Sequence, residues 1–282
     1  MCVIFWTVSH HPKYRFVFAG NRDEFFARPA AKAHFWPEPN QNVLAGTDLE
    51  NQATPLHNGT WLGITRNGRF AALTNFREAK NMGARSRGVL VRDFLTAKTS
   101  SVRDYMQDLQ PMMQEFSGFN LVCFDLLSQE GAYITNRRHD GITYLKNGDI
   151  YGLSNSTLDD PWPKVRQGCQ RFEEVLAKDR GEDELVEELF NLLSMTKPFS
   201  DTSNMETTFD EIKSRIFIPH LQNPNSGQNS AYGTRTGTVV LVDHEGQVVF
   251  VERDHCEFKG ADLTPPDNKT VTFRFTMDEN IS

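Results

Sequence analysis

Cys2, the second residue of the chain, carries two groups that can act together chemically. A small side chain at this position normally permits removal of the initiator methionine, which leaves cysteine with a free α-amine. A thiol has a reference pKa of about 8.5 and an α-amine one of about 7.7–8, so roughly 14% of the amine is neutral at pH 7. The neutral amine can accept the thiol proton, as in enzymes that use an N-terminal threonine. Cys2 is therefore a candidate nucleophile, although a lone cysteine here more often just starts an apolar strand.

A polar cluster, Asn21-Arg22-Asp23-Glu24, ends the strand predicted to pair with the strand at Cys2. A hairpin would place this cluster beside the cysteine. A carboxylate there can hold the N-terminal ammonium, and an arginine can lower the pKa of the thiol or bind a substrate oxygen. The alternative is a solvated strand end with local salt bridges.

Three further polar residues end apolar strands, namely Asn75, Asn155 and Arg235. Asparagine amides and backbone N–H groups are the usual donors of an oxyanion hole, the site that stabilises negative charge on a reacting carbonyl oxygen. Each residue alone is more often part of a turn. Together with Cys2 and Arg22, they make up a set of residue types that recurs in catalytic sites.

The elements that must position these residues begin with two predicted β-hairpins. Asn67-Gly68 marks the turn of the second hairpin, because both residues tolerate positive φ. Residues 28–58 hold four of the 13 prolines and are predicted to form a long surface connection. The predicted strands of this region are 2–8, 14–19, 61–65 and 70–74, with one short strand near 43–45.

Two pairs of amphipathic helices alternate with strands in the rest of the chain. Ser101 and Asp104 form a capping pattern at one helix start, and Asn147-Gly148 is predicted to be another hairpin turn. Most neighbouring strands are joined by hairpins, so the sheets should be largely antiparallel, forming a sandwich with the helices. We predict one domain over 1–282, with 277–282 as a loose tail. The predicted helices are 88–98, one starting at 101, 163–178 and 183–195; the strands are 119–127, 132–135, 142–145, 150–153, 238–243, 247–252 and 270–275.

The composition is that of a globular protein and excludes several classes. The net charge of −7 and the lack of a basic block argue against sequence-independent nucleic-acid binding. No apolar stretch approaches the ~18 residues of a membrane helix, and the N-terminus lacks the pattern of a signal peptide. The four cysteines, at 2, 123, 169 and 256, lack the spacing of a zinc or redox motif and suit a reducing compartment. We therefore expect no metal site.

Several longer segments resemble the Asn-Arg-Asp-Glu family, whose animal members are called transport and Golgi organisation protein 2. The family is in turn similar to the N-terminal nucleophile hydrolases, with bile-salt hydrolases and penicillin V acylases as the nearest analogy. The resemblance implies an α+β fold, a four-layer αββα sandwich with largely antiparallel sheets. The matching segments are Met1-Cys2-Val3-Ile4, Asn21-Arg22-Asp23-Glu24-Phe25, Gly59-Thr60-Trp61-Leu62-Gly63, Ala72-Leu73-Thr74-Asn75, Tyr151-Gly152-Leu153-Ser154-Asn155, Pro161-Trp162 and Tyr232-Gly233-Thr234-Arg235.

The resemblance also implies roles for individual residues. Cys2 would be the nucleophile, Arg22 would lie near its thiol and Asp23 would contact its α-amine. One departure matters: the hydrolases separate this arginine and aspartate by two residues, whereas here they are adjacent and point to opposite faces of a regular strand. It is therefore open whether Asp23 or Glu24 contacts the α-amine of Cys2. Two pairs of residues share a face of a regular strand and are the alternatives, Asn21 with Asp23 and Arg22 with Glu24. The remaining expectations are Asn75 as oxyanion donor, Asn155 as a contact of the amine or substrate, Arg235 as part of the polar network, and Asn21, Glu24 and Trp61 as substrate-binding residues.

Two functions compete at this point. The residues favour hydrolysis of a C–N amide bond in a small or lipid-like substrate. The family's associations with Golgi organisation, protein secretion, and mitochondrial and lipid homeostasis favour a non-enzymatic haem or lipid carrier that uses the same pocket. We expect an amide, acyl or haem ligand, with haem as cargo and no resident cofactor. We expect a cytoplasmic protein with mitochondrial or Golgi-associated pools.

Overall fold

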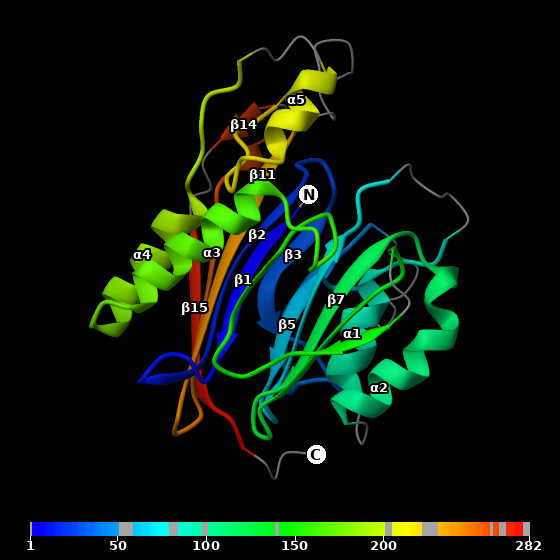
Figure 1. The fold of residues 1–282 in the computed structure, drawn as a ribbon, viewed down its shortest axis with the longest axis vertical. Coiled ribbons are helices and arrows are strands. Elements are labelled where there is room, and N and C mark those ends of the chain that lie inside the picture. The colour runs from blue at the N-terminus through cyan, green and yellow to red at the C-terminus, as the bar shows by residue number, and fades with distance from the viewer. Residues whose placement is uncertain are drawn as a thin grey trace.

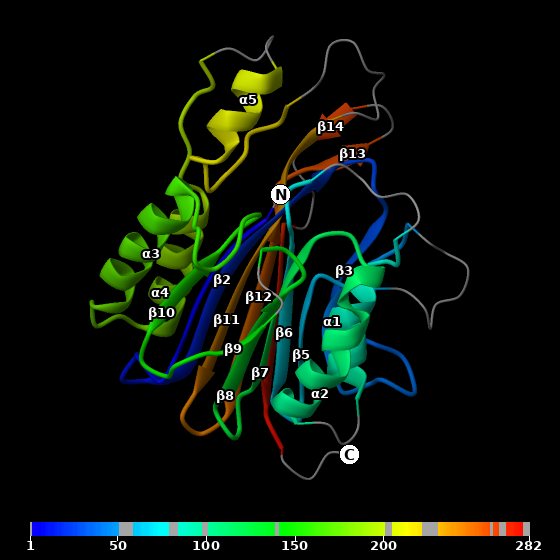
Figure 2. The ribbon, with the colours of Figure 1, turned by 45° about the vertical axis from the view of Figure 1, so that its right-hand side comes forward.

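The computed structural model describes residues 2–50, 59–78, 84–97, 101–138, 141–200, 205–221, 231–259, 262–264 and 269–278. Within them, two large antiparallel sheets lie face to face, and each carries a pair of helices on its outer side (Figure 1). The turned view separates the layers, with α3 and α4 outside one sheet and α1 and α2 outside the other (Figure 2). The predicted four-layer αββα sandwich is confirmed.

The six-stranded sheet has the order β10-β1-β2-β11-β12-β15. Its first two strands form the predicted N-terminal hairpin, in which Val3 pairs with Asn21 and Val8 with Phe16. The long strand β11 then pairs with β2 along almost its whole length. The strands are β1 (Val3–Val8), β2 (Tyr14–Phe25), β10 (Ile150–Leu153), β11 (Tyr232–Asp243), β12 (Gln247–Asp254) and β15 (Thr270–Thr276).

The seven-stranded sheet follows chain order from β3 to β9. Gly68, with φ of +83°, forms the predicted turn between two of its strands. A separate short hairpin of β13 (Glu257–Lys259) and β14 (Asp262–Thr264) lies near the N-terminus (Figure 2). The strands of the large sheet are β3 (Ala30–Phe35), β4 (Val43–Asp48), β5 (Leu62–Thr65), β6 (Arg69–Asn75), β7 (Phe119–Asp125), β8 (Glu130–Thr135) and β9 (Ile142–Tyr144).

The helices form the two outer layers. Gly168 allows α3 to approach β1 closely, because a Cβ at this position would lie 2.1 Å from the Phe5 ring. The described helices are α1 (Gly88–Thr96), α2 (Val102–Leu109) with the 3-10 helix η2 (Gln110–Glu115), α3 (Pro163–Leu176), α4 (Glu182–Leu193) and α5 (Met205–Ile212).

Alternation along the strands divides the core into layers. On β1, Trp6 faces the other sheet, where its ring lies 6.1 Å from Phe124, while Phe5 faces the helices and stacks on Phe172. Phe18 and Phe70 join the sheets in the same way, at 4.9 Å. Because each aromatic side chain removes a large apolar area from water, this middle layer fixes the two sheets against each other.

Three sequence predictions differ from the structure. The connection over 28–58 contains a second strand, β3, in addition to β4. The segments at 142–144 and 150–153 are not a hairpin, because β9 pairs with β8 and β10 pairs with β1 in the other sheet. The predicted loose tail begins later than residue 277, since Met277 is buried and its N–H donates to the Gly246 carbonyl. Residues 279–282 of that tail lie outside the described residues.

The capping pattern at Ser101 gives a first testable prediction. The Ser101 hydroxyl accepts from the Asp104 backbone N–H at 3.1 Å, and the Asp104 carboxylate accepts from the Ser101 backbone N–H at 3.3 Å. Replacing Ser101 with alanine should lower the free energy of unfolding by about 1 kcal/mol, because an N–H at the helix start loses its partner. Urea denaturation measures this, and an unchanged midpoint would show that the cap does not stabilise the fold.

Candidate functional site

Cys2 lies immediately before β1, at the end of the six-stranded sheet where β2 carries the cluster of residues 21–24. Its sulfur accepts a hydrogen bond from the Asp23 backbone N–H. Its carbonyl accepts a hydrogen bond from the Ser154 hydroxyl at 2.7 Å, which fastens the first residue of the strand to the segment after β10. The thiol is therefore held on regular, hydrogen-bonded structure.

Cys2 and Arg22 lie together in a pocket between the two sheets. The pocket is small, with a cavity volume of about 10 Å³, roughly room for one water molecule. The Arg22 guanidinium stacks over the Trp61 ring, 4.1 Å from its centroid, and the residue is only 6% exposed. Among the described residues, the Arg22 guanidinium takes part in no hydrogen bond or ion pair. The pocket walls are mainly apolar and include Ile4, Phe18, Leu62, Ala72 and Leu73.

The cluster on β2 divides between the two faces of its strand, as expected for adjacent residues. Arg22 faces the pocket between the sheets, whereas Asn21 and Asp23 face the helices. The Asn21 amide donates to the carbonyls of Leu193 and Ile216 at 2.8 and 3.1 Å, so it joins the strand to the helical layer. Asn21 also lines the pocket beside Cys2, and its substrate-binding role stays a prediction.

Asp23 is the buried carboxyl next to Cys2. Its side chain is 3% exposed and accepts a hydrogen bond from the Thr234 hydroxyl at 2.6 Å. Burial raises its pKa, and the positive charges of the N-terminus and Lys164 lower it. Glu24 is more exposed and lies 3.9 Å from the Arg28 guanidinium. Asp23 is therefore the buried carboxyl of the cluster, and Glu24 is the more exposed one.

Asn75 and Asn155 are joined to each other and to the Cys2 strand through the backbone. The Asn155 amide is 1% exposed and donates to the Asn75 carbonyl at 2.5 Å, while its oxygen accepts from the Ser154 hydroxyl at 3.2 Å. Asn75 pairs with Phe119 of β7, whose side chain packs among the helices, so alternation turns the Asn75 side chain away from the pocket. The oxyanion role of Asn75 stays a prediction, and the strand alternation gives its side-chain amide no direct path to the pocket.

Arg235 lies at the same end of the sheet, at an irregularity where the pairing of β11 with β2 shifts between Thr234 and Thr236. Its guanidinium donates to the carbonyls of Phe25 and Arg28 at 3.2 and 2.5 Å. Burial lowers its pKa to about 10, and the neighbouring Arg22 charge adds to this. Arg235 thus braces the turn after β2 and does not line the pocket.

The groups around Cys2 change the pKa of its thiol in opposite directions. Burial raises the pKa of the Cys2 thiol, and the Asp23 charge adds to this. The Asp23 backbone N–H and the Arg22 charge lower it. The Arg22 charge favours the thiolate, the reactive form of cysteine, but burial outweighs it and the pKa of the thiol stays raised.

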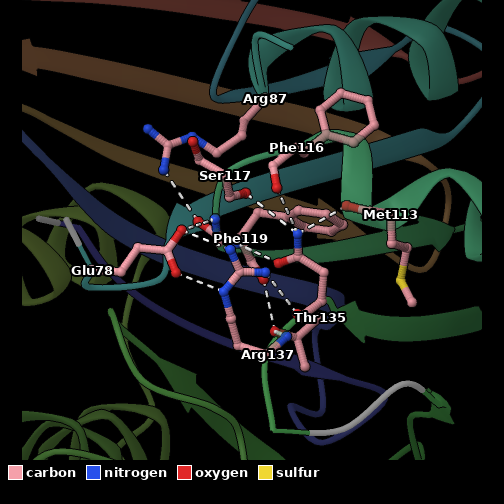
Figure 3. Close-up of polar contacts among 10 residues, drawn as sticks. Glu78, Arg87, Met113, Phe116, Ser117, Phe119, Thr135 and Arg137 are labelled. Atoms are coloured by element: carbon pink, nitrogen blue, oxygen red, sulfur yellow. Dashed lines mark hydrogen bonds and ion pairs between the residues drawn. The ribbon is translucent and has the colours of Figure 1, made fainter. Parts of the chain in front are cut away.

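A second polar network joins the segments that follow β6 and β8 to the segment before β7 (Figure 3). Glu78 accepts from both the Arg137 guanidinium and the Gly118 backbone N–H, and the hydrogen bond with Arg137 lowers the pKa of Glu78. Arg87 donates to the Gly118 carbonyl at 3.1 Å, and its charge is within range of Cys2. This network fixes the loop before β7 near the site.

Two residues that sequence reasoning missed also belong to the surroundings of Cys2. The sequence singles out Asn155 but not its neighbour Ser154, whose hydroxyl holds the Cys2 carbonyl only through the fold. Lys164 was passed over inside an amphipathic helix, although a lysine in the first turn of a helix is unusual, since the helix dipole disfavours a cation there. That position is the signal that could have identified it.

Glu252 provides a pH-dependent prediction at the rim of the sheets. It is 3% exposed, and its carboxyl accepts from the Ala33 backbone N–H at 2.7 Å, so it connects β12 to β3 of the other sheet. Burial raises its pKa from 4.5 to about 7. Between these values the folded protein keeps a proton that the unfolded chain has released, so this group lowers stability as pH rises through that window.

Glu252→Gln should therefore be more stable than the native protein at pH 8, on the order of 3 kcal/mol, with the difference disappearing below about pH 5. Glutamine keeps the acceptor for Ala33 without a titrating proton. Denaturation curves of both proteins at several pH values measure the effect. A stability difference that does not change with pH would contradict the assigned burial of the charge.

Two kinds of feature were not found in the described part of the chain, a metal-ligand cluster and a membrane-spanning helix. Its residues include no group of three metal-ligating side chains of the histidine, cysteine or carboxylate type. Each helix described there is too short or too polar to span a bilayer.

The fold and the site together define a four-layer αββα sandwich with a cysteine at the start of a central strand and a pocket beside it. The chain belongs to the Transport and Golgi organisation 2 family, whose sequence profile matches residues 1–257. It is 37% identical to the Transport and Golgi organization protein 2 homolog of Bos taurus, over 97% of this chain and 99% of the bovine protein. It is 33% identical to the homolog of Homo sapiens, with the same coverage.

Among solved structures, the chain is similar to penicillin V acylase from Agrobacterium tumefaciens. The TM-score is 0.46 at 14% sequence identity, covering 98% of this chain and 86% of the acylase. At this distance the roles of individual residues have to be argued from the contacts of this chain itself.

Proposed function

We propose that this protein hydrolyses a C–N amide bond with Cys2 as an N-terminal nucleophile. The observation that carries the proposal is the pocket in which Cys2 lies beside the Arg22 guanidinium, a buried cation that has no hydrogen bond or ion pair among the described residues. A free guanidinium next to a thiol provides both a charge that favours the thiolate and a donor for a substrate oxygen.

The proposed reaction has two balanced steps. The neutral α-amine of Cys2 accepts the thiol proton, and the sulfur attacks the amide carbonyl carbon. The C–N bond breaks, the proton passes to the leaving nitrogen, and the acyl group remains on Cys2 as a thioester. Water then attacks the thioester with the α-amine as base, which releases a carboxylic acid and restores the thiol.

Each residue has a position that suits its proposed role. Arg22 donates to the carbonyl oxygen as negative charge develops on it, replacing the Asn75 amide that the sequence suggested. Asp23 orients the α-amine from the helical side of the sheet. Trp61 supports the Arg22 guanidinium, and Ser154 fixes the Cys2 backbone. Asn155 and Arg235 hold the surrounding loops.

The apolar pocket walls suit the acyl group of a small or lipid-like amide, and the side chains that line the pocket have to move apart to admit it. The names of the relatives associate the family with Golgi organisation. We propose that the reaction serves lipid or mitochondrial homeostasis and protein secretion, from a cytoplasmic location with Golgi-associated or mitochondrial pools.

The test is turnover of a panel of N-acyl amides of increasing acyl length by the purified protein with Met1 removed. Release of the amine, followed by mass spectrometry, supports the proposal. A carrier of haem or lipid makes a different forecast: no amide is cleaved, and binding of haem or of a fatty acyl ligand is the same in the native protein and in Cys2→Ala. That pair of results would overturn the hydrolase and support the carrier.

A further inference from the structure

A chain of buried hydrogen bonds joins the seven-stranded sheet to the segment that holds Cys2. Asn120 of β7 lies at its centre, is 0% exposed, and by alternation along the strand faces the other sheet. Its amide nitrogen donates to the carbonyls of Ser154 and Ser156 at 3.3 and 2.9 Å. Both carbonyls belong to the segment after β10, whose Ser154 hydroxyl donates to the Cys2 carbonyl at 2.7 Å. Asn120 therefore reaches Cys2 through a single intervening residue.

Two hydroxyl groups, one from β8 and one from β6, complete this chain. The Tyr133 hydroxyl donates to the Asn120 side-chain oxygen at 2.8 Å and accepts from the Leu158 backbone N–H at 3.3 Å. The Thr74 hydroxyl donates to the Ser154 carbonyl and accepts from the Asn120 amide at 3.2 Å. Three neighbouring strands of one sheet, β6, β7 and β8, thus each contribute a side chain that holds the segment after β10.

The direction of each hydrogen bond in this chain is fixed by its end groups. The Leu158 N–H can only donate, so the Tyr133 oxygen accepts there and sends its own proton to the Asn120 oxygen. That bond settles which way the Asn120 amide points, with its nitrogen toward carbonyls that can only accept. Burial raises the pKa of Tyr133 to about 12, so the hydroxyl keeps the proton that it donates. The segment after β10 is therefore held in one arrangement.

The pocket at Cys2 has walls from both sheets. Ile4 and Arg22 come from the six-stranded sheet, and Leu62 and Leu73 come from the seven-stranded one. The layer between the sheets is largely apolar, and apolar packing has no preferred direction. Hydrogen bonds constrain both distance and angle. A hydrogen-bonded chain across this layer is therefore suited to set the distance between the thiol and the opposite wall.

We propose that Asn120 and Tyr133 are positioning residues of the Cys2 site, which hold the segment after β10 and, through the Ser154 hydroxyl, set the place of the Cys2 thiol in the pocket. The inference rests on the proposed function, because the place of the thiol matters to a reaction only if that thiol reacts. Neither residue is among those that line the pocket, so both act through Ser154 and not on a substrate. Misplacing a reacting atom by about 1 Å can cost about 10²-fold in rate.

The experiment measures Cys2 itself and requires no substrate. Full-length protein is treated with iodoacetamide under native conditions at one pH, and mass spectrometry of the cysteine peptides gives the alkylation rate of each thiol. Tyr133→Phe removes one hydroxyl and keeps the ring, so the Asn120 oxygen and the Leu158 N–H lose their partner. Losing one typical hydrogen bond changes a local opening equilibrium by about fivefold. Cys2 should therefore be alkylated about five times faster, because its partly buried thiol is exposed more often.

Tyr105→Phe is the matched control. The Tyr105 hydroxyl is also partly buried, but it donates to the Leu90 carbonyl at 2.6 Å in the helical layer outside the seven-stranded sheet. Removing it costs the fold a hydrogen bond of the same kind and should leave Cys2 alkylation unchanged. Cys123, which is 0% exposed, reports global opening and should stay unreactive in both variants. A Cys2 rate that Tyr133→Phe does not change, or that Tyr105→Phe raises equally, would overturn the proposal.

A second arm tests whether Tyr133 acts through Asn120. Asn120→Leu keeps the size of the side chain and removes both its donor and its acceptor. In that background Tyr133→Phe should accelerate Cys2 alkylation much less than it does alone, because the path to Ser154 is already broken. Equal acceleration in both backgrounds would contradict the link through Asn120. If Tyr133→Phe does not fold, as judged by its thermal transition, Asn120→Leu alone replaces it in the first arm, with the same expected acceleration.

The outcome is distinguishable from failure of the hydrolase itself. Faster alkylation in Tyr133→Phe without amide turnover by the native protein would support the positioning role and contradict the hydrolase. Turnover by the native protein with unchanged alkylation in Tyr133→Phe would contradict only the positioning role. In a protein with both properties, Tyr133→Phe should lower kcat by about tenfold and change KM less, because Arg22 and the apolar walls keep their places. Tyr105→Phe should leave both constants unchanged.

Discussion

Replacing Cys2 with alanine is expected to lower amide turnover by at least about 10³-fold, because the proposed nucleophilic thiol of the pocket is removed. The fold should tolerate the change, with a loss of about 1 kcal/mol in the free energy of unfolding, since few atoms are lost. Cys2→Ser should be slow rather than inactive, because serine is still a nucleophile but has a much higher pKa. Turnover rates and denaturation curves of the three proteins check both parts.

An N-terminal extension tests the role of the α-amine separately from that of the thiol. A tag before Cys2 leaves the thiol and every other side chain in place but removes the free α-amine. The account predicts a loss comparable to that of Cys2→Ala. Full activity of the tagged protein together with an inactive Cys2→Ala protein would contradict an amine-assisted nucleophile and indicate a thiol that works without it.

Removing the Arg22 guanidinium should have the second largest effect. Arg22→Met is expected to lower kcat by about 10²–10³-fold, the usual loss for one donor to a developing oxyanion. The same change should raise the pKa of the Cys2 thiol, because the Arg22 charge lowers it in the native protein. The lost hydrogen-bond donor and the raised thiol pKa should both lower turnover at neutral pH.

Arg22→Lys separates the two contributions. It keeps the charge near the thiol but loses the planar group that stacks on Trp61 and can donate two parallel hydrogen bonds. The midpoint of the pH profile for Cys2 alkylation should therefore move to higher pH in Arg22→Met and much less in Arg22→Lys. The value of kcat should fall in both. An alkylation profile that is the same in all three proteins would show that Arg22 does not influence the thiol.

Short-range sequence patterns predicted the elements that depend on local chemistry. The turn at Gly68 and the cap at Ser101 lie where glycine and serine are locally required, and both are present in the structure. The N-terminal hairpin was equally readable, because its two apolar runs are separated by a short polar segment. These predictions needed no knowledge of distant residues.

Pairing between distant segments was not readable in this way. The turn at Gly148 has the positive φ that was predicted, but the strands on either side of it belong to different sheets. Strand β3 was missed because its sequence, from Ala30 to Phe35, is rich in alanine and follows a proline, which makes it a weak local signal.

In the candidate site, too, local patterns were readable from the sequence and contacts between distant segments were not. Alternation on β2 correctly separated Arg22 from Asp23, but only the tertiary fold shows that the charge of the buried Lys164 acts on Asp23. The register of β6 turns the Asn75 side chain away from the pocket, which residue type alone could not indicate. Lys164 is 141 residues from Asp23 in the chain, so no local pattern connects them.

The central claim, that Cys2 is an N-terminal nucleophile, is tested most directly by mass spectrometry of the N-terminal peptide of native protein quenched during turnover of an N-acyl amide. The account predicts that Met1 is absent and that part of the peptide carries the acyl group on the Cys2 sulfur. A peptide that retains Met1, or one with a free Cys2 that never carries an acyl group while the amide is cleaved, would contradict it.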